Sequence, residues 1–491
     1  MNRTTTHAPG QLNRTTAHAP GQRGSVLVLG GGLAGLAAAL RLGEQGFAVT
    51  VLESRQRLGG RAGSFTDPIS GQLIDACQHV SMGCCTAFAH FARATGIAHL
   101  IEPQPTLYFM TPDRRVSRFR ADPLPAPLHL ARAFLQLHTL SLAEKLRIAQ
   151  GLRRLQATSP AELAADPPFV EWLASARQPR RAVERFWGLV LVSALNETVE
   201  RVGLRYAHQV FTEGFLGSRR AFEVHLPRVP LGRLYGAELQ RAFDRLGVRV
   251  LLNHAVRRIE LVGGAVQGVC LRDGQTLRAD GYVAALPFAR LLEVLPEQAV
   301  NEQPQFARLR HLRVAPITSV HVWYDRPITR LPHVVLVDCL GHWLFNRGEL
   351  AAGEHYVQVV VSAARHLREQ GHDQSQQQIL AELARLFPGA RQARVLRART
   401  ITETAATFCP VPGVDHDRPP QATPYRNLTL AGDYTRTGWP ATMEGAVRSG
   451  YLAADALAHS LDHAHSLDHA QPLKQSAGVA EPPAVAGGLR R

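Results

Sequence analysis

The sequence predicts an α/β protein built around a parallel sheet, with an α+β part interleaved into it. Two observations predict this fold. An apolar run, a glycine-rich turn, an apolar helix and a second apolar run follow one another within residues 26–52, which is the pattern of a βαβ unit. A further apolar run, a loop and a helix opened by Pro follow at residues 428–446. The apolar runs lack alternation, which is typical of strands buried on both faces.

The composition is that of a large folded protein. The chain has 491 residues, of which 45% are hydrophobic and 19% are charged. That length suits about three domains and a large core. The composition excludes a collagen, a coiled coil, a disulfide miniprotein and a wholly disordered chain. No run of about 18 apolar residues without a charge occurs, so we expect no membrane-spanning helix.

The net charge of +15 comes from arginine, because 53 of the 55 basic residues are Arg and only Lys145 and Lys474 are Lys. The arginines are scattered along the chain and no known nucleic-acid module occurs, so nucleic acid is not an expected partner. We interpret the charge as a compositional bias, with attraction to an anionic membrane surface as the alternative.

The cysteines and the N-terminus predict a cytoplasmic protein without a metal site. Three of the six cysteines are bunched within residues 77–85 and three are isolated, which fits neither a secreted disulfide framework nor a zinc site. A reducing compartment is therefore expected. Residues 1–24 are polar and lack the apolar segment of a signal peptide.

Short repeats at both ends predict disordered tails at residues 1–23 and 462–491. A polar ten-residue segment occurs twice within residues 2–22, and HSLDHA occurs twice within residues 459–470. Such segments cannot bury enough apolar surface to offset their chain entropy. The body between them is predicted to hold a discontinuous nucleotide-binding domain (24–104, 222–290 and 400–461) and a substrate-binding domain (105–221 and 291–399).

The glycine-rich turn predicts a dinucleotide site. It follows a strand, opens a helix and reads Gly30-Gly31-Gly32-Leu33-Ala34-Gly35. Gly30 permits the tight turn, Gly32 lets the backbone approach a pyrophosphate, and Gly35 lets the helix pack close to the sheet. The first helical residues, Leu33 and Ala34, offer free backbone N–H groups to the phosphates. Glu53 ends the next strand, where an acid accepts hydrogen bonds from ribose hydroxyls.

The residues directly after Glu53 indicate FAD rather than NAD as the dinucleotide. They read Ser54-Arg55-Gln56-Arg57-Leu58-Gly59-Gly60-Arg61. This second glycine pair with an Arg resembles the extended FAD signature of the amine oxidase and carotenoid desaturase superfamily. The resemblance implies a Rossmann-type FAD-binding domain of the amine oxidase and glutathione reductase kind. It also implies that Gly59, Gly60 and Arg61 lie near the pyrophosphate and flavin, with Ser54 and Arg55 as further contacts.

A second motif near the C-terminus resembles the other FAD motif of the same superfamily. A strand at residues 428–431 ends in Gly432-Asp433, and a loop and a helix starting near Ala441 follow. The resemblance implies that Asp433 binds the ribityl or pyrophosphate region. The helix start, Ala441-Thr442-Met443, then directs backbone N–H groups at the flavin, where a helix dipole stabilises negative charge.

Two segments in the middle of the chain resemble further parts of that fold. Residues 247–256 read as a strand pair, and in relatives a Val at this place contacts the adenine through its backbone, so Val256 is the candidate. Residues 282–287 resemble the strand that crosses to the substrate domain. Ordinary core strands are the alternative for both segments.

A narrower resemblance rests on two blocks. Residues 75–86 read DACQHVSMGCCT and resemble the D-x-x-Q-H block of the squalene-associated FAD-dependent desaturases, the hydroxysqualene dehydroxylases of bacterial hopanoid synthesis. Residues 431–450 resemble the C-terminal block of the same family. This chain departs from the family at Ala76-Cys77, where many members read Asn-Gly, and at Cys84-Cys85, where others have small or aromatic residues. The resemblance covers about residues 25–460.

This resemblance implies reduction of hydroxysqualene to squalene with electrons from FAD. Loss of the allylic hydroxyl as water leaves a delocalised cation that accepts a hydride from the flavin, and a proton donor assists the departure. His79 is the first candidate donor, with Asp75 as its orienting partner and Glu444 as a second donor. A hydrogen-bonded structural pair is the alternative for Asp75 and His79.

The substrate side is expected to be apolar. Residues 128–156 predict one amphipathic basic helix, packed on the body or lying on a membrane surface near a lipid entry path. The segments 184–195 and 317–323 are expected to line an apolar tunnel. The expected partners are a small isoprenoid substrate, a membrane at its cytoplasmic face and other enzymes of squalene synthesis.

Three other functions stay open at this point. A carotenoid or phytoene desaturase shares the fold and the lipid substrate but runs the oxidation. An amine oxidase is disfavoured, because many place a Lys beside the flavin and this chain has no Lys within residues 146–473. A flavin-binding protein without activity is the third.

Overall fold

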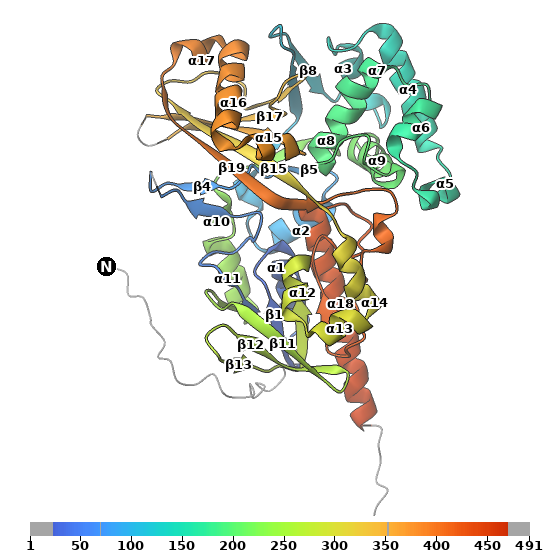
Figure 1. Ribbon diagram of the computed structural model, residues 1–491, viewed down its shortest axis with the longest axis vertical. Coiled ribbons are helices and arrows are strands. Elements are labelled where there is room, and N and C mark those ends of the chain that lie inside the picture. Colours follow the sequence, from blue (N-terminus) through green and yellow to red (C-terminus); the bar gives the residue numbers. More distant parts are fainter. Residues whose placement is uncertain (1–22, 69, 351–352, 470–491) are drawn as a thin grey trace, which may run out of the picture.

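The computed structural model describes residues 23–68, 70–350 and 353–469. The molecule has two halves (Figure 1). In the view of Figure 1, the lower half holds the N-terminal βαβ unit and the long C-terminal helix. The upper half holds a large sheet and a group of helices. Residues 1–22 and 470–491 of the two predicted tails (1–23 and 462–491) lie outside the described residues.

A five-stranded parallel sheet forms the core of the lower half. Its order is β10 (Arg249–Leu251), β2 (Ala48–Leu52), β1 (Ser25–Leu29), β14 (Gly281–Ala284) and β20 (Leu428–Leu430). The N-terminal βαβ unit and the C-terminal strand thus meet in one sheet, as an α/β fold requires. All five residues of β1 are buried, because the sheet is covered on both faces.

Alternate residues of β1 pack against the two covering layers. Val26 and Val28 share a core cluster with residues of α1 (Leu33–Glu44) and α18 (Met443–His469). Leu27 and Leu29 share another with the antiparallel sheet of β11 (Val256–Val262), β12 (Ala265–Leu271) and β13 (Thr276–Leu277). The crossing of α1 and α18 is close, since a Cβ at Gly450 would lie 2.2 Å from the carbonyl oxygen of Ala34.

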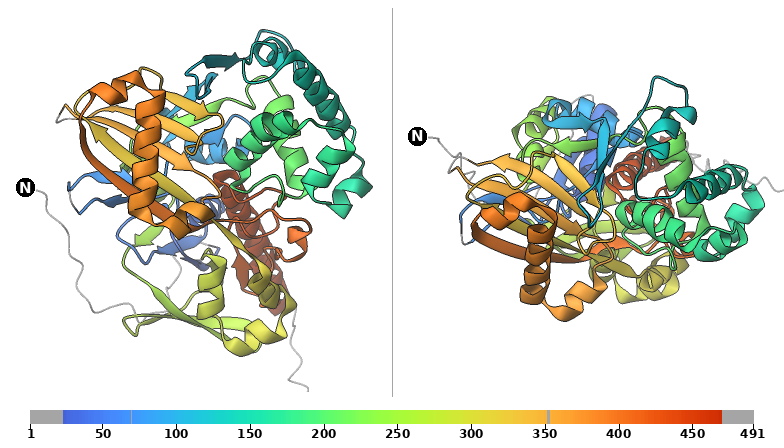
Figure 2. Two further views of the ribbon diagram at one scale, coloured as in Figure 1. Left: turned by 45° about the horizontal axis from the view of Figure 1, so that its top comes forward. Right: turned by 90° about the horizontal axis from the view of Figure 1, so that it is seen from above.

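A seven-stranded mixed sheet forms one side of the upper half (Figure 2). A third core cluster fills the space between this sheet and the helix α16 (His372–Leu386). The strand order is β19 (Val395–Phe408), β15 (Val314–Tyr324), β18 (His355–Val361), β17 (Trp343–Glu349), β16 (His333–Leu336), β7 (Thr106–Met110) and β8 (Val116–Arg120).

Helices form the other side of the upper half, beside the edge of the sheet (Figure 2). An aromatic cluster holds them together, in which Trp187 and Phe211 pack edge to face with ring centroids 4.6 Å apart. The helices are α3 (Ala131–Leu135), α4 (Leu142–Gln156), α5 (Pro160–Ala165), α6 (Phe169–Ser175), α7 (Arg180–Ala182), α8 (Leu189–Leu195) and α9 (Leu204–Phe211).

The predicted amphipathic helix over residues 128–156 is wrong as a single element. The chain forms a short turn of helix at Leu128–Leu130, then α3, then a break, then α4. In the break Leu137 and Leu140 are buried. Ser141 then starts α4 with a capping box, in which Ser141 and Glu144 each accept a backbone hydrogen bond from the other residue.

Three predicted boundaries fall inside regular elements. Residues 290 and 291 both lie within α12 (Phe288–Val294). Residue 400 lies within β19, a strand of the upper sheet. Helix α18 continues to His469, so residues 462–469 are helical where a disordered tail was predicted. Leu461 is buried against the core, and Asp462 forms an ion pair with Arg23. These contacts extend the helix beyond the predicted end of the body.

Candidate functional site

A large cavity lies where the two halves meet. Its volume is about 820 Å³, near the upper end of the range for small-molecule sites. Its walls come from both glycine-bearing motifs, from β11 and from residues 76–85. The upper sheet and the helices α8 and α9 complete it. The cavity contains all the predicted cofactor residues except Gly35, and two of the three predicted catalytic residues.

The glycine turn after β1 leaves room at one glycine only. A Cβ at Gly35 would lie 1.9 Å from the carbonyl oxygen of Gly30, and a Cβ at Gly30 would lie 2.5 Å from that of Ala285. At Gly32 the nearest atom to an added Cβ is the Cα of Gly60, at 3.9 Å. Gly30 and Gly35 therefore close the turn onto the sheet, whereas Gly32 leaves open space at the start of α1.

Glu53 lies at the end of β2, beside this turn. Its carboxylate accepts hydrogen bonds from the backbone N–H of Gly31 at 2.9 Å and of Arg55 at 2.8 Å, and from the hydroxyl of Ser54 at 3.1 Å. Glu53 is buried and lines the cavity. These bonds fix the carboxylate at the place predicted for ribose recognition.

The second glycine pair lies against the first turn. The backbone N–H of Gly59 donates to the carbonyl of Gly31 at 2.9 Å. Both Gly59 and Gly60 have positive φ, +106° and +61°, which favours glycine. Arg61 forms an ion pair with Asp433 and donates to the carbonyl of Ala406 at 2.9 Å. The Arg61–Asp433 pair therefore joins the two motifs that lie 372 residues apart.

The start of α18 faces the cavity from the C-terminal motif. Gly432 adopts φ +155°, and its N–H donates to the hydroxyl of Ser449 at 2.8 Å. Ala441 and Thr442 line the cavity, as does Met443, the first residue of α18. A helix of 27 residues presents its positive dipole end here. The motif thus offers backbone donors to an electron-rich group.

Val256 also lines the cavity, at the start of β11. Its carbonyl accepts a hydrogen bond from Arg290 at 2.6 Å. Arg290 and Arg272 line the cavity here together with Arg55. Arg55 was expected from its place after Glu53, whereas no local motif in the sequence marks Arg272 and Arg290. Their positive charge suits the phosphate groups of a dinucleotide.

These features fit FAD. A flavin dinucleotide needs hydrogen-bond donors and acceptors and room for its phosphates. The site offers open space at Gly32, the Glu53 carboxylate as an acceptor for ribose hydroxyls, basic side chains in the lining and two helix N-termini. The residues predicted from the motifs all line the cavity and would hold FAD there: Gly30, Gly32, Leu33, Ala34, Glu53, Ser54, Arg55, Gly59, Gly60, Arg61, Val256, Gly432, Asp433, Ala441, Thr442 and Met443. Gly35 does not line the cavity, but its missing side chain lets α1 pack close to the turn.

His79 and Gln78 line the cavity. His79 lies near Met443, and the neighbouring residues Cys77 and Val80 pack in one cluster with Phe345 and Trp343. The His79 Nδ1 lies 3.0 Å from the carbonyl oxygen of Cys77, so Nδ1 carries the hydrogen and Nε2 is left as an acceptor. Burial lowers the pKa of His79 below its usual value. Arg347 holds Gln78, donating to its side-chain oxygen at 2.9 Å. The pair is therefore fixed in place, with a neutral imidazole at pH 7.

Asp75 does not orient His79, which corrects the prediction. Its carboxylate is buried outside the cavity lining and accepts hydrogen bonds from the hydroxyl of Ser64 at 2.5 Å and the N–H of Leu231 at 2.8 Å. Burial raises the pKa of Asp75. The carboxylate therefore ties β4 (Leu73–Asp75) to the start of α10 (Leu231–Leu234). The imidazole is oriented by the Cys77 carbonyl instead.

Glu444 also has a structural role that argues against proton donation. Its carboxylate is fully buried and accepts hydrogen bonds from the N–H groups of Ala87 at 3.0 Å and Phe88 at 2.8 Å. Arg448 donates to it at 2.7 Å. Glu444 thus binds the N-terminus of α2 (Thr86–Ala94), where a negative charge is stabilised by the helix dipole. We do not keep it as a donor.

The part of the cavity wall that the upper half contributes is mostly apolar, and we call it the apolar end. The expected segments contribute to it: Leu189 and Val190 come from 184–195, and Ile317 comes from β15. Trp187, from the same helical segment, is buried in the core instead. The other apolar lining residues include Leu107, Phe109, Val210, Phe215, Val335, Trp343, Phe345 and Val360. An uncharged, elongated ligand suits this end.

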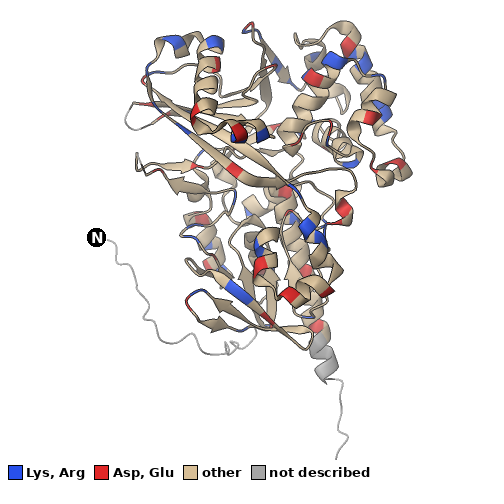
Figure 3. Cartoon of the chain, viewed as in Figure 1, with Lys and Arg blue, Asp and Glu red and all other residues tan. Residues whose placement is uncertain are grey.

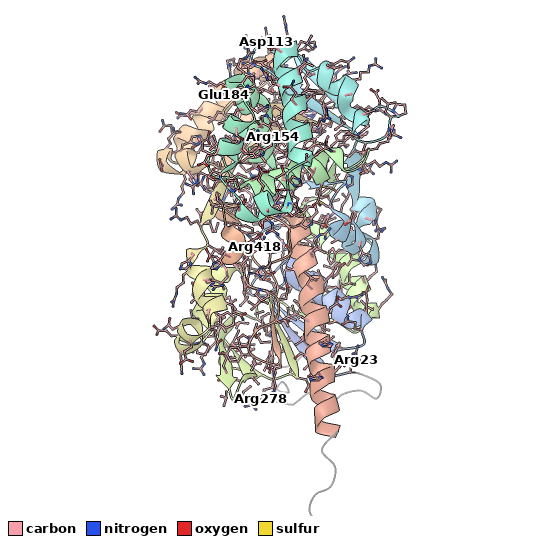
Figure 4. All side chains as sticks on the ribbon, turned by 90° about the vertical axis from the view of Figure 1, so that its right-hand side faces the viewer. Arg23, Asp113, Arg154, Glu184, Arg278 and Arg418 are labelled. Atoms are coloured by element: carbon pink, nitrogen blue, oxygen red, sulfur yellow. The ribbon has the colours of Figure 1, made fainter. Side chains whose placement is uncertain are left out.

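Two acids and a third arginine, besides Arg272 and Arg290, were not found from the sequence. Glu403 on β19 and Glu213 line the cavity. Arg418 is buried behind the Asp433 loop and donates to the carbonyls of Asp433, Thr435 and, at 3.4 Å, Tyr434. Figure 4 places Arg418 in the middle of the molecule, near the upper end of α18. No local sequence pattern marks Arg418, because its role depends on tertiary contacts.

The fold and the site define a flavoprotein oxidoreductase with a buried apolar substrate cavity. The chain belongs to the family described as flavin containing amine oxidoreductase, which matches residues 33–458. The protein is an FAD-dependent oxidoreductase. No group of His, Cys, Asp and Glu in the described part of the chain is arranged to hold a metal ion. None of the helices in that part is both long and apolar enough to cross a membrane.

Known proteins similar to this chain include 15-cis-phytoene desaturases and an amine oxidase of known structure. The 15-cis-phytoene desaturase of Glycine max is 28% identical over 468 residues, covering 88% of this chain and 78% of the relative. That of Synechococcus elongatus is 27% identical over 465 residues, covering 88% and 95%. Among solved structures, cyclohexylamine oxidase from Brevibacterium oxydans superposes with a TM-score of 0.65 at 21% identity, covering 89% of this chain and 99% of that chain. This last likeness shows the fold alone.

Proposed function

We propose that the protein reduces hydroxysqualene to squalene. The observation that carries the proposal is that the Gln78–His79 pair lines the same cavity as the cofactor motifs and the apolar side chains of β15, β17 and β18. The same pair belongs to the block that resembles the hydroxysqualene dehydroxylases. A long hydrocarbon with a single hydroxyl fits such a cavity, because only the reacting end needs a polar partner.

The chain's residues have distinct roles in this reaction. FAD in its reduced form supplies the hydride. The apolar end holds the hydrocarbon and excludes water. His79 in its protonated form donates a proton to the hydroxyl, which leaves as water, and Gln78 positions the same end of the substrate. The reaction consumes one alcohol, two electrons and two protons, and it forms one alkene hydrocarbon and one water.

Phytoene or carotene desaturation is the second candidate, and it is favoured by the two phytoene desaturases described above. That reaction removes hydrogen from the substrate instead of water. A neutral His79, with Nε2 free to accept a proton, suits it as well. Amine oxidation is less well supported, because the one Lys among the described residues, Lys145, donates to the carbonyl of Leu135 at 2.6 Å and does not line the cavity.

Product analysis separates these candidates. The purified holoenzyme is reduced anaerobically, mixed with hydroxysqualene in detergent, and its extract is analysed by gas chromatography. We expect squalene. The His79→Ala variant is expected to lose activity, and the matched control is His90→Ala, since His90 is an exposed histidine bonded to Tyr451. Failure of the reduced enzyme to make squalene, with desaturation of phytoene by the oxidised enzyme, would favour the second candidate.

A further inference from the structure

Exposed leucines gather on one segment of the helical side. Of the twelve large hydrophobic residues that are exposed in the described part of the chain, five fall within residues 124–146. We call them the leucine surface: Leu124, Leu128, Leu135, Leu142 and Leu146, which are 47%, 58%, 56%, 64% and 58% exposed. Single exposed leucines need no explanation, whereas a group indicates an interaction site.

The segment is fixed, so the leucines project from a defined structure. Leu142 and Leu146 are four residues apart on α4 and therefore share one face. Lys145, between them in sequence, donates to the carbonyl of Leu135 at 2.6 Å, which ties the end of α3 to α4. Figure 1 shows α3 and α4 at the upper rim of the molecule, opposite the C-terminal end of α18.

The inner side of this segment packs beside the apolar end of the cavity. Leu130 and Leu137 belong to a core cluster with Leu107, and Phe134 and Phe215 pack against it. Leu107 and Phe215 also line the cavity. One layer of protein therefore has the cavity on one side and the leucine surface on the other.

Basic side chains flank the leucine surface. Arg118 and Arg120 are the exposed residues at the end of β8, whose burial alternates. Arg132 on α3 and Arg147 on α4 are exposed as well. Of the nearby acids, Glu144 is tied up by Ser141 and by an ion pair with Arg181, and Asp122 is half-buried. Figure 3 shows both basic and acidic residues on these upper helices.

We propose that the leucine surface docks on an anionic phospholipid bilayer. Leucines surrounded by arginines match the apolar interior and the negative surface of such a bilayer. Docking places the wall of the cavity against the lipid, from which a water-insoluble substrate enters. The entry of an isoprenoid rests on the proposed function, whereas the docking itself does not.

The test is flotation of the holoenzyme with vesicles. One vesicle population contains phosphatidylcholine alone and the other contains phosphatidylcholine with phosphatidylglycerol. We expect flotation with the anionic vesicles at low salt. Salt and the neutral lipid should each weaken it, by about fivefold for every arginine that acts at the surface. Equal binding to both vesicle types at all salt concentrations would contradict the role of the arginines.

The variant that removes the surface is L128Q/L135Q/L142Q/L146Q, since Gln is compatible with a helix. We expect vesicle binding to fall by about 100-fold or more. The matched control is L452Q on α18, at a leucine that is 45% exposed and lies outside the surface. The control should bind as the unchanged chain does.

Other occupants of the surface give other results. If a second copy of the chain covers it, the unchanged protein is a dimer by light scattering, the fourfold variant is a monomer, and no vesicle binding occurs; this overturns the proposal. Full vesicle binding by the fourfold variant also overturns it. The flavin absorbance of the variant and its turnover of detergent-dispersed hydroxysqualene should stay unchanged. Absence of squalene from every protein would count against the proposed function alone, because flotation does not depend on it.

Discussion

Two glycines of one turn are expected to respond differently to the same substitution. At Gly35 an added Cβ would lie 1.9 Å from a carbonyl oxygen of Gly30, so Gly35→Ala forces α1 away from the turn. Such overpacking costs about 3 kcal/mol or more of unfolding free energy. At Gly32 the φ is −75° and the nearest atom is 3.9 Å from the added Cβ. Gly32→Ala therefore changes the stability of the apoprotein by at most about 1 kcal/mol.

For FAD affinity, in contrast to stability, the substitution at Gly32 is expected to have a large effect. A Cβ at Gly32 would fill the open space in which the backbone would approach the pyrophosphate of FAD. Each charge-assisted hydrogen bond lost there would cost about 1.5–3 kcal/mol. FAD affinity of Gly32→Ala should fall by about 10- to 100-fold. The assays are thermal unfolding of the apoprotein and titration with FAD, followed by flavin absorbance. Wild-type FAD affinity in Gly32→Ala, or wild-type stability in Gly35→Ala, would refute the roles assigned to these glycines.

Three further substitutions test the site. His79→Ala should keep FAD and lower turnover about 10²- to 10⁴-fold. Because burial lowers the pKa of His79 below 6.5, the rate of hydroxysqualene reduction by the unchanged enzyme should rise about tenfold per pH unit as the pH falls from 7 towards that lowered pKa. A flat pH profile would contradict proton donation by His79. Glu444→Gln should destabilise the protein by about 1–2 kcal/mol in thermal unfolding, since it removes the charge at the start of α2, and an unchanged Tm would contradict the capping role. Arg418→Met should lower the free energy of unfolding by about 3 kcal/mol or more. It should also lower the FAD content, because Arg418 donates to the carbonyls of the Asp433 loop. Full FAD content with normal stability would show that the loop keeps its structure without Arg418.

Local patterns predicted the cofactor motifs well. The strands at 25–29 and 48–52, and the helix that begins at Leu33, agree with the structure. Their apolar runs and glycines depend on near neighbours in sequence, and their order leaves few ways to build a sheet. The spacing also predicted the position of Glu53, which directly follows β2, the strand that pairs with β1 before the turn.

The failures have specific physical causes. The break in the predicted helix at 128–156 was marked by Ser141 and Glu144, a capping-box pattern that an amphipathic reading overlooks. The capping of α2 by Glu444 joins groups 356 residues apart, so no local pattern contains it. Arg418 and the hydrogen bonds of Asp75 depend on tertiary contacts in the same way. Sequence therefore found the residues near the flavin more readily than it found their roles.

The most direct test is anaerobic mixing of the flavin-reduced enzyme with hydroxysqualene in a stopped-flow instrument. The oxidised flavin spectrum should return in a single turnover, and the quenched sample should contain one squalene per flavin. A flavin that stays reduced for as long as a buffer control, or that is reoxidised without squalene, would contradict a hydride-donating cofactor beside an apolar cavity built for this alcohol.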